Sequence, residues 1–349
     1  MLMDKELECD FVFGDTMSDV KKMDYSLLFH FKKEVRNRKL FRRFTWQQGV
    51  VPLLRENYTH YIMLGDVAYL STWAMIILAR VFGKKMYLWS HGWYGKESKL
   101  RLLITKFLFF NLPTGIFLYG NYARSLMIEA GLDARKLHVI YNSLDYDTQI
   151  EIRRNCKSSP IYERYFQNSH KTLIFVGRLT KVKRLDILLH AVSELNKMHL
   201  KFNLVLIGTG EMQHELISLT NELKIKEYVW FYGASYNEKE LSELIYNADL
   251  CVAPGNVGLT AIHSMTYGTP VVTHNNFPYQ MPEFEAIEKG ITGNFFEYND
   301  GLSLVETIQK WFEKDPDRNF IREKCYEVID TKYNPHVQLE TIKSVLNDD

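Results

Sequence analysis

The sequence has no apolar run long enough to cross a membrane. Its most apolar stretches are interrupted by polar residues or proline, as at Ser71, Lys106 and Pro113, before they reach the roughly 18 to 20 residues of a transmembrane helix. The first ten residues, MLMDKELECD, are acidic where a secretory signal would be basic and then apolar. These absences predict a cytoplasmic protein.

Cysteine is scarce, and its four copies do not form a pattern. Cys9, Cys156, Cys251 and Cys325 are scattered, and no pair has the spacing of metal ligands. Reduced thiols are the simplest interpretation. No acidic metal-binding cluster is evident either, so the sequence predicts neither a metal nor another cofactor. With 349 residues, 46% of them hydrophobic and 24% charged, the chain is expected to form two globular domains.

Net charge is also nearly absent, at +1, but it is unevenly distributed. Up to Asp145 there are 21 lysines and arginines against 14 aspartates and glutamates, and after it there are 22 against 28. Two clusters, Phe31–Phe44 and Lys96–Phe110, alternate cations with apolar residues. We expect basic amphipathic helices that lie on an anionic membrane surface. The alternative is that their apolar residues pack on a sheet. A near-neutral chain without a recognised module does not favour nucleic-acid binding.

Apolar strands alternate with helical patterns along the chain, which is typical of α/β domains with parallel sheets. In the first half we expect strands at Glu8–Gly14, Tyr61–Leu64, Lys85–Trp89, Gly115–Tyr119 and Leu137–Ile140. In the second half we expect them at Leu173–Val176, Asn203–Ile207, Asp249–Pro254 and Thr269–Thr273.

The segment Asp249–Thr273, DLCVAPGNVGLTAIHSMTYGTPVVT, combines a strand, a glycine-bearing loop, a short helix and a second strand. Gly255 and Gly258 allow the loop backbone to approach a ligand closely. Free amides at a helix start, with the positive end of the helix dipole behind them, favour a phosphate or a polarised sugar oxygen. The alternative is an ordinary strand-to-helix turn.

Four cations follow the strand Leu173–Val176, namely Arg178, Lys181, Lys183 and Arg184. Arginine presents a planar fork to phosphate and lysine a movable charge, so Arg178 and Lys183 are able to clamp a diphosphate. A solvated basic loop is the alternative. Gly208 begins a GTG turn after the next strand, which is a weak signal by itself.

The order of the motifs VGRL, IGTGE, FYG, NADLCVAP, GLTAIHSM, GTPVV and PE followed by TG resembles a known family. It looks like the nucleotide-sugar half of retaining glycosyltransferases of family 4, group 1 type, over Thr172 to about Phe296. In the first half, YLWSHGWYG and KLHVIYNSLD resemble segments of the same family. The resemblance implies the α/β GT-B fold, in which two Rossmann-like parallel-sheet domains face a cleft.

The resemblance also implies how the domains divide. The expected parts are an acceptor-side domain at residues 1–145, a linker at 146–171, a nucleotide-sugar domain at 172–334, and a final helix at 335–349 that returns to the first domain. The first strand and helix of the family's N-terminal domain have no counterpart before Glu8, so we expect that domain to lack them.

Carried over residue by residue, the resemblance implies roles for several positions. Arg178 and Lys183 match residues that bind the donor diphosphate. His91, after the strand in YLWSHGWYG, matches a histidine beside the donor sugar and is the expected catalytic residue. The remaining expected donor contacts are Gly208 and the backbone at Gly258, Leu259 and Thr260.

The sequence departs from the family at two glutamates that contact the donor sugar and the nucleotide ribose. Gly255 and His263 stand at those positions. His263 still offers one hydrogen bond to a ribose hydroxyl. Asn256, whose amide both donates and accepts, is the expected replacement for the missing sugar contact.

The resemblance therefore implies a metal-independent, retaining hexosyltransferase of cell-surface polysaccharide or lipopolysaccharide assembly. The expected partners are a nucleotide-diphosphate sugar, a saccharide or polyprenyl-linked acceptor, and an anionic membrane at the inner face of the plasma membrane. Three alternatives are a sugar-nucleotide epimerase of the same fold, a degenerate nucleotide-sugar-binding protein, and a membrane-surface interaction protein.

Overall fold

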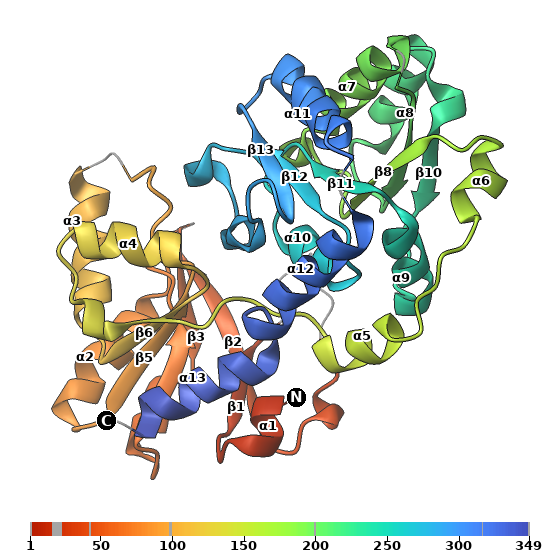
Figure 1. Ribbon diagram of the computed structural model, residues 1–349. Helices are drawn as coiled ribbons and strands as arrows, with labels where there is room; N and C mark the ends of the chain where they lie inside the picture. Colours follow the sequence, from red (N-terminus) through yellow and green to blue (C-terminus); the bar gives the residue numbers. More distant parts are fainter. Residues whose placement is uncertain are drawn as a thin grey trace. The chain divides into compact units, whose positions relative to one another are not determined.

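The computed structural model describes residues 2–15, 23–41, 43–97, 100–198, 200–315 and 317–347. The chain forms two compact units (Figure 1). Unit 1 contains residues 1–141 and 336–349, and unit 2 contains residues 142–335. Each unit has an α/β architecture around a parallel sheet.

Unit 2 is built on a six-stranded sheet in the order β10-β9-β8-β11-β12-β13. Every neighbouring pair in it is parallel. The strands are β8 (Lys171–Val176), β9 (Phe202–Ile207), β10 (Val229–Gly233), β11 (Leu250–Ala253), β12 (Val271–His274) and β13 (Gly293–Phe296). All six side chains of β9 and all four of β11 are buried, as expected for central strands covered on both faces.

The helices around this sheet form two groups, packed on it directly or on one another (Figure 1). The first group is α7 (Leu185–Lys197), α8 (Gln213–Glu222) and α11 (Gly301–Glu313). The second group is α5 (Tyr146–Arg153), α6 (Ile161–Phe166), α9 (Glu238–Asn247), α10 (Leu259–Thr266) and α12 (Arg318–Thr331). Because the strands are parallel, the loops that enter α7, α8, α9 and α10 all leave the same edge of the sheet.

Residues 146–171, which the sequence predicts to be a polar linker, belong to unit 2 in the structure. They contain α5 and α6, followed by the first residue of β8. Tyr162 and Phe166 on α6 are buried, and the Tyr162 hydroxyl donates to the Leu244 carbonyl at 2.5 Å. This apolar and hydrogen-bonded contact with α9 is the reason that the segment packs as part of the unit.

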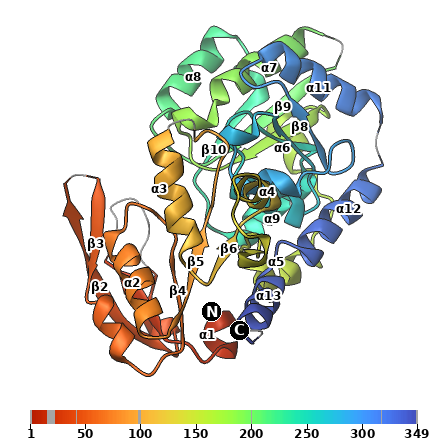
Figure 2. The ribbon, with the colours of Figure 1, turned by 90° about the vertical axis from the view of Figure 1, so that its left-hand side faces the viewer.

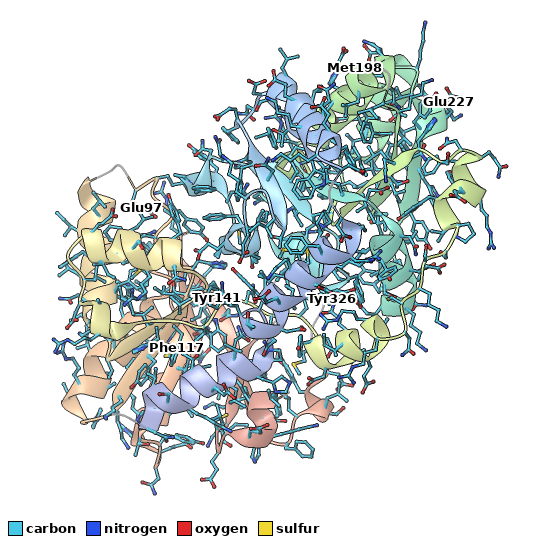
Figure 3. The ribbon with its side chains drawn as sticks, in the orientation of Figure 1. Glu97, Phe117, Tyr141, Met198, Glu227 and Tyr326 are labelled. Carbon is cyan, nitrogen blue, oxygen red and sulfur yellow. The ribbon has the colours of Figure 1, made fainter. Side chains whose placement is uncertain are left out.

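Unit 1 contains a four-stranded parallel sheet in the order β4-β5-β6-β7. Its strands are β4 (His60–Leu64), β5 (Lys85–Ser90), β6 (Gly115–Leu118) and β7 (Leu137–Val139). Its helices are α1 (Leu2–Glu6), α2 (Leu70–Val81), α3 (Leu100–Asn111), α4 (Asn121–Glu129) and α13 (Pro335–Asn347). Ile342 of α13 packs with buried Tyr87, Phe117 and Ile140, and Figure 3 labels Phe117 among these packed side chains.

The structure corrects the helix predicted for Phe31–Phe44. This segment forms β2 (Phe31–Leu40), which pairs in parallel with β1 (Phe11–Gly14) and antiparallel with β3 (Phe44–Gln48). Figure 2 shows the β2–β3 hairpin, whose strand β3 contacts α2. Val35 is buried while Arg36 and Arg38 are exposed, a period of two that favours a strand. Arg36 and Arg38 therefore lie on an exposed face of a hairpin and not of a helix, whereas Lys32 and Lys33 are partly buried and Arg42 lies outside the described residues.

The second basic cluster does form a helix, α3, and its apolar residues divide between two environments. Phe110 is buried in the core of unit 1, and Leu103 and Phe107 pack against that core. Ile104 and Leu108 are more than half exposed. The Lys106 ammonium pairs with Glu97 at 2.7 Å. One side of α3 thus packs on the core of unit 1, and the apolar residues of its other side are exposed.

Candidate functional site

The candidate site is built on three strand-to-helix loops of unit 2 that pack backbone against backbone. A Cβ atom on Gly208 would overlap the carbonyl oxygen of Gly177, and one on Gly255 would overlap the carbonyl oxygen of Val182. The Leu179 amide also donates to the Thr209 carbonyl at 3.0 Å. The GTG turn at Gly208 therefore joins the loop after β9 to the loop after β8.

Lys183 connects the loop after β8 to the loop after β11. Its ammonium donates to the backbone carbonyl of Asn256 at 2.7 Å and to the Asn256 side-chain oxygen at 2.9 Å. A Cβ atom on Gly258, the N-cap of α10, would lie 3.9 Å from the Lys183 Nζ. The ammonium thus lies beside the N-terminus of α10, where the first helix amides lack intrahelical partners.

Burial lowers the pKa of Lys183 to about 8; the negative charge of Glu283 opposes this change and the positive charge of Arg178 adds to it. Arg178 itself is exposed, and within the residues that the structure describes its guanidinium forms no ion pair. Two cations therefore lie close enough to repel each other. A bound dianion would relieve that repulsion.

The start of α10 is held in place by two hydrogen bonds. The Thr260 hydroxyl donates to the Val176 carbonyl at 2.8 Å, which fixes the helix to the end of β8. The Val257 amide donates to the side-chain oxygen of buried Gln280 at 2.9 Å. The hydroxyl of Thr260 is thus engaged within the protein. Leu259, between them, is 42% exposed.

Glu283 is a buried carboxylate near this loop. One of its oxygens accepts from the Asn142 side-chain amide at 2.6 Å. The other oxygen is buried and has no hydrogen-bond partner within the described residues. The negative charge of Glu283 raises the pKa of Lys183 and so opposes the effect of burial. Glu283 thus supplies negative charge behind the cations of the candidate site.

On α10, His263 is hydrogen-bonded to a carboxylate of α9. Its Nε2 is 2.9 Å from Oε1 of Glu238, the first residue of α9. The hydroxyl of Tyr267 and the amide of Gln149 donate to the same oxygen at 2.6 and 2.9 Å. Sequence reasoning missed Glu238 and Gln149, because nothing local in the sequence indicates that α5 and α9 meet α10 here.

His91 belongs to unit 1, where it follows the end of β5. It is partly buried, and the centroid of its ring lies 4.7 Å from that of Tyr119 and 6.1 Å from that of Tyr94. The backbone beside it is fixed, since the Gly92 amide donates to the Ser90 hydroxyl at 3.1 Å. Lys183, Asn256 and Gly258 therefore lie together in unit 2. His91 belongs to unit 1.

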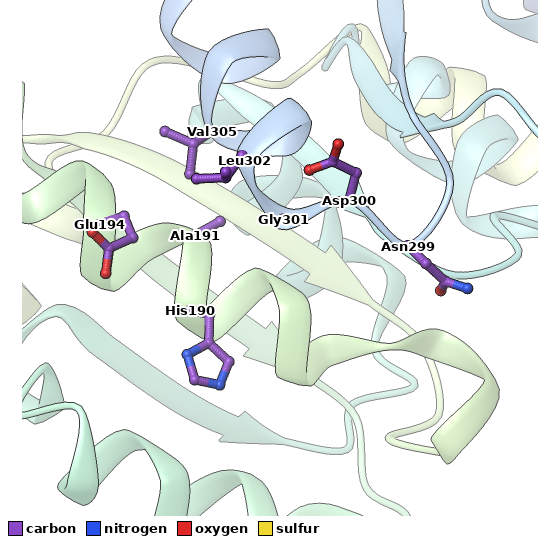
Figure 4. A pocket seen from close by; sticks show the side chains of 8 residues that line it. All are labelled: His190, Ala191, Glu194, Asn299, Asp300, Gly301, Leu302 and Val305. Carbon is purple, nitrogen blue, oxygen red and sulfur yellow. The ribbon is translucent and has the colours of Figure 1, made fainter.

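A surface pocket of about 590 Å³ lies between α7 and the start of α11 (Figure 4). It is lined by His190, Ala191, Glu194, Asn299, Asp300, Gly301, Leu302 and Val305. None of these is a candidate site residue, so we do not identify this pocket with the candidate site. In the described part of the chain, no group of three or more His, Cys, Asp or Glu is arranged to hold a metal ion. None of the helices described there has the length and apolar character to span a bilayer.

Comparisons with known proteins agree with this architecture. Residues 163–328 match the family model described as "Glycosyl transferases group 1". An uncharacterized 41.2 kDa protein in the cps region of Klebsiella pneumoniae is 28% identical over 232 residues, which are 62% of this chain and 58% of that protein. The D-inositol 3-phosphate glycosyltransferase of Mycolicibacterium smegmatis is 26% identical over 200 residues, 56% of this chain and 44% of that enzyme. The chain thus spans less than two thirds of either relative.

Two solved structures share the fold over most of the chain. Alr3699/HepE of Anabaena, in complex with UDP, has a TM-score of 0.69 and 17% identity, and the match covers 92% of this chain and 87% of that one. The lipopolysaccharide outer core galactosyltransferase WaaB, in its apo form, has a TM-score of 0.69 and 15% identity, with coverage of 95% and 88%. The fold is α/β GT-B.

Proposed function

We propose that this protein transfers a hexosyl group from a nucleotide-diphosphate sugar to an acceptor hydroxyl, with retention of anomeric configuration and without a metal ion. The observation that carries the proposal is the position of the Lys183 ammonium beside the N-terminus of α10, with the exposed guanidinium of Arg178 in the same loop. Two cations and free helix amides form a binding site for a diphosphate.

The same groups account for the chemistry. When the bond between the sugar and the diphosphate breaks, negative charge develops on the leaving phosphate. Lys183, Arg178 and the amides of Leu259 and Thr260 stabilise that charge, which lowers the barrier by preorganised electrostatics. The acceptor hydroxyl attacks the anomeric carbon and gives its proton to the departing phosphate, and we assign His91 to orient the reacting groups. Asn256, already bonded to Lys183, is the proposed contact to the donor sugar, and the turn at Gly208 borders the nucleotide.

The names of similar proteins support a nucleotide-sugar donor and a role in cell-surface polysaccharide assembly. HepE is described in complex with UDP-glucose and WaaB as a lipopolysaccharide galactosyltransferase, and the Klebsiella protein is encoded in a cps region. We therefore propose a role in cell-surface polysaccharide or lipopolysaccharide assembly, with a saccharide or polyprenyl-linked acceptor. We also propose that the protein works at the cytoplasmic face of the plasma membrane, in contact with anionic lipid.

The first experiment measures nucleotide binding. UDP, GDP, ADP and dTDP are compared by thermal shift, and the preferred diphosphate is titrated by calorimetry. We expect Arg178→Ala to weaken its binding roughly 10- to 150-fold, which corresponds to the loss of one charged hydrogen bond. Lys181→Ala, which removes an exposed cation from the same loop, is the matched control and should leave the affinity within about twofold.

The proposal fails if none of the diphosphates binds, or if Arg178→Ala binds as tightly as the unaltered protein. Incubation of the matching nucleotide sugar with lipid-linked saccharides then tests transfer, and NMR of the product reports the anomeric configuration. Turnover of the donor in the absence of any acceptor would indicate an epimerase instead.

A further inference from the structure

Glu238 carries an unequal set of hydrogen bonds. All three of its side-chain donors, Gln149, His263 and Tyr267, are directed to Oε1. Within the described residues, Oε2 accepts no hydrogen bond, and it is not among the buried polar atoms that lack a partner. The side chain is 27% exposed. One oxygen therefore fixes the carboxylate, while the other can be reached from solvent.

The carboxylate is ionised at neutral pH. Burial disfavours the charge, but the hydrogen bonds and charge of His263, followed by the bonds from Tyr267 and Gln149, lower the pKa of Glu238 to about 2. Its place at the first position of α9 favours negative charge as well, because of the helix dipole. An ionised carboxylate only accepts hydrogen bonds, so the group that Oε2 would take is a donor, such as a hydroxyl.

The position of Glu238 relates it to the diphosphate site. His263, which holds its Oε1, is four residues beyond Leu259 on α10, or about 6 Å along the helix axis. The start of that helix is where Lys183 lies. A ribose joined to a diphosphate at the helix start covers such a distance. This spacing along α10 is compatible with Glu238 and Lys183 contacting two parts of one nucleotide.

We propose that Oε2 of Glu238 accepts a hydrogen bond from a ribose hydroxyl of the bound nucleoside diphosphate, while His263, Tyr267 and Gln149 position the carboxylate. This inference rests on the proposed function. It assigns His263 a positioning role in place of the direct ribose contact that the sequence predicts. The protein would then select ribonucleotides through a carboxylate from α9.

The test compares UDP, or GDP or ADP if the panel selects one of them, with its 2′-deoxy and 3′-deoxy forms, and a preference for dTDP would leave only its 3′-deoxy form to compare. We expect the unaltered protein to bind at least one deoxy form roughly 10- to 150-fold more weakly, since a charged hydrogen bond is lost. Glu238→Gln keeps an oxygen for the three donors and replaces the charged acceptor with an amide. In this variant we expect the preference to fall to about threefold or less, with little change for the deoxy form.

Two controls separate this inference from the proposed function. Glu240→Gln alters a neighbouring carboxylate on α9, which is bonded to Tyr232 and Ser235, and should retain the full preference. Arg178→Ala should weaken the ribo and deoxy forms equally. Equal affinity of the unaltered protein for all three compounds would overturn the inference without any variant, as would an undiminished preference in Glu238→Gln. Absence of all nucleotide binding would instead remove the proposed function and this inference with it.

Discussion

At the scale of single residues, the depressed pKa of Lys183 makes a prediction about pH. Burial places this pKa at about 8, so the ammonium holds its proton below that pH and loses it above. A neutral amine does not attract a diphosphate. We therefore expect the affinity of the protein for UDP to be greatest below about pH 8 and to fall by up to about tenfold per pH unit above it.

Calorimetric titrations between about pH 7 and 9.5 measure this dependence. Lys183→Arg is the matched variant, because a guanidinium stays charged throughout that range. Its affinity should be independent of pH even if it is lower overall. A parallel decline in both proteins would assign the pH dependence to another group.

Some residues of the candidate site can be predicted from the sequence and others cannot. Lys183, Asn256 and Gly258 were named from two separate loops, and they meet because parallel strands deliver their loops to one edge of the sheet. Glu238 could not be found in this way, nor could the contact of Glu283 with Asn142. The pairs Glu238–His263 and Glu283–Asn142 are 25 and 141 positions apart in the sequence, and both contacts depend on how helices and loops pack.

At the scale of elements, the close approach of the loops after β8 and β9 predicts that Gly208 resists substitution. Its φ is +135°, and a Cβ atom there would overlap the Gly177 carbonyl. Gly233 also has a positive φ, +89°, but a Cβ atom there would meet nothing within 4 Å. At either glycine, a residue with a side chain would be strained by the positive φ. Only at Gly208 would the added Cβ atom also overlap another atom.

We expect Gly208→Ala to lower the free energy of unfolding by about 1–3 kcal/mol more than Gly233→Ala, since only the first adds a steric overlap. Urea unfolding followed by circular dichroism measures the difference. Equal destabilisation of the two variants would mean that the loops can separate without penalty.

The elements themselves could be predicted where their pattern was long and regular. Four of the six strands of unit 2, β8, β9, β11 and β12, lie within about two residues of their predicted ranges, because each is a continuous apolar run closed by glycine, proline or a polar residue. No strand was expected at β10 or β13. The structure of the segment Phe31–Phe44 could not be predicted, since its mixed cations and apolar residues fit both helical and strand periods. Pairing of β2 with β1 and β3, which no local pattern encodes, decides between them.

At the scale of the whole molecule, the excess of basic residues before Asp145 predicts binding to anionic membranes. Unit 1 also exposes apolar side chains near its cations: Phe41, after β2, is 88% exposed, and Ile104 and Leu108 on α3 are 53% and 51% exposed. We expect the protein to float with phosphatidylglycerol vesicles but not with phosphatidylcholine vesicles, and to be released by salt.

Combined replacement of Phe41, Ile104 and Leu108 by serine should abolish flotation without lowering the thermal midpoint of unfolding. Leu302→Ser, at a 73% exposed apolar position of unit 2, is the control and should float normally. Flotation that ignores lipid charge, or that survives the triple replacement, would contradict peripheral contact.

Helix α13 gives unit 1 an unusual dependence on the order of synthesis. Ile342 completes a cluster with Tyr87, Phe117 and Ile140, yet residues 142–335 leave the ribosome before it does. Unit 2 is continuous in sequence and can begin to fold at once. The side of this cluster that α13 covers stays exposed until α13 is translated, and during that interval the nascent chain presents apolar surface that favours aggregation.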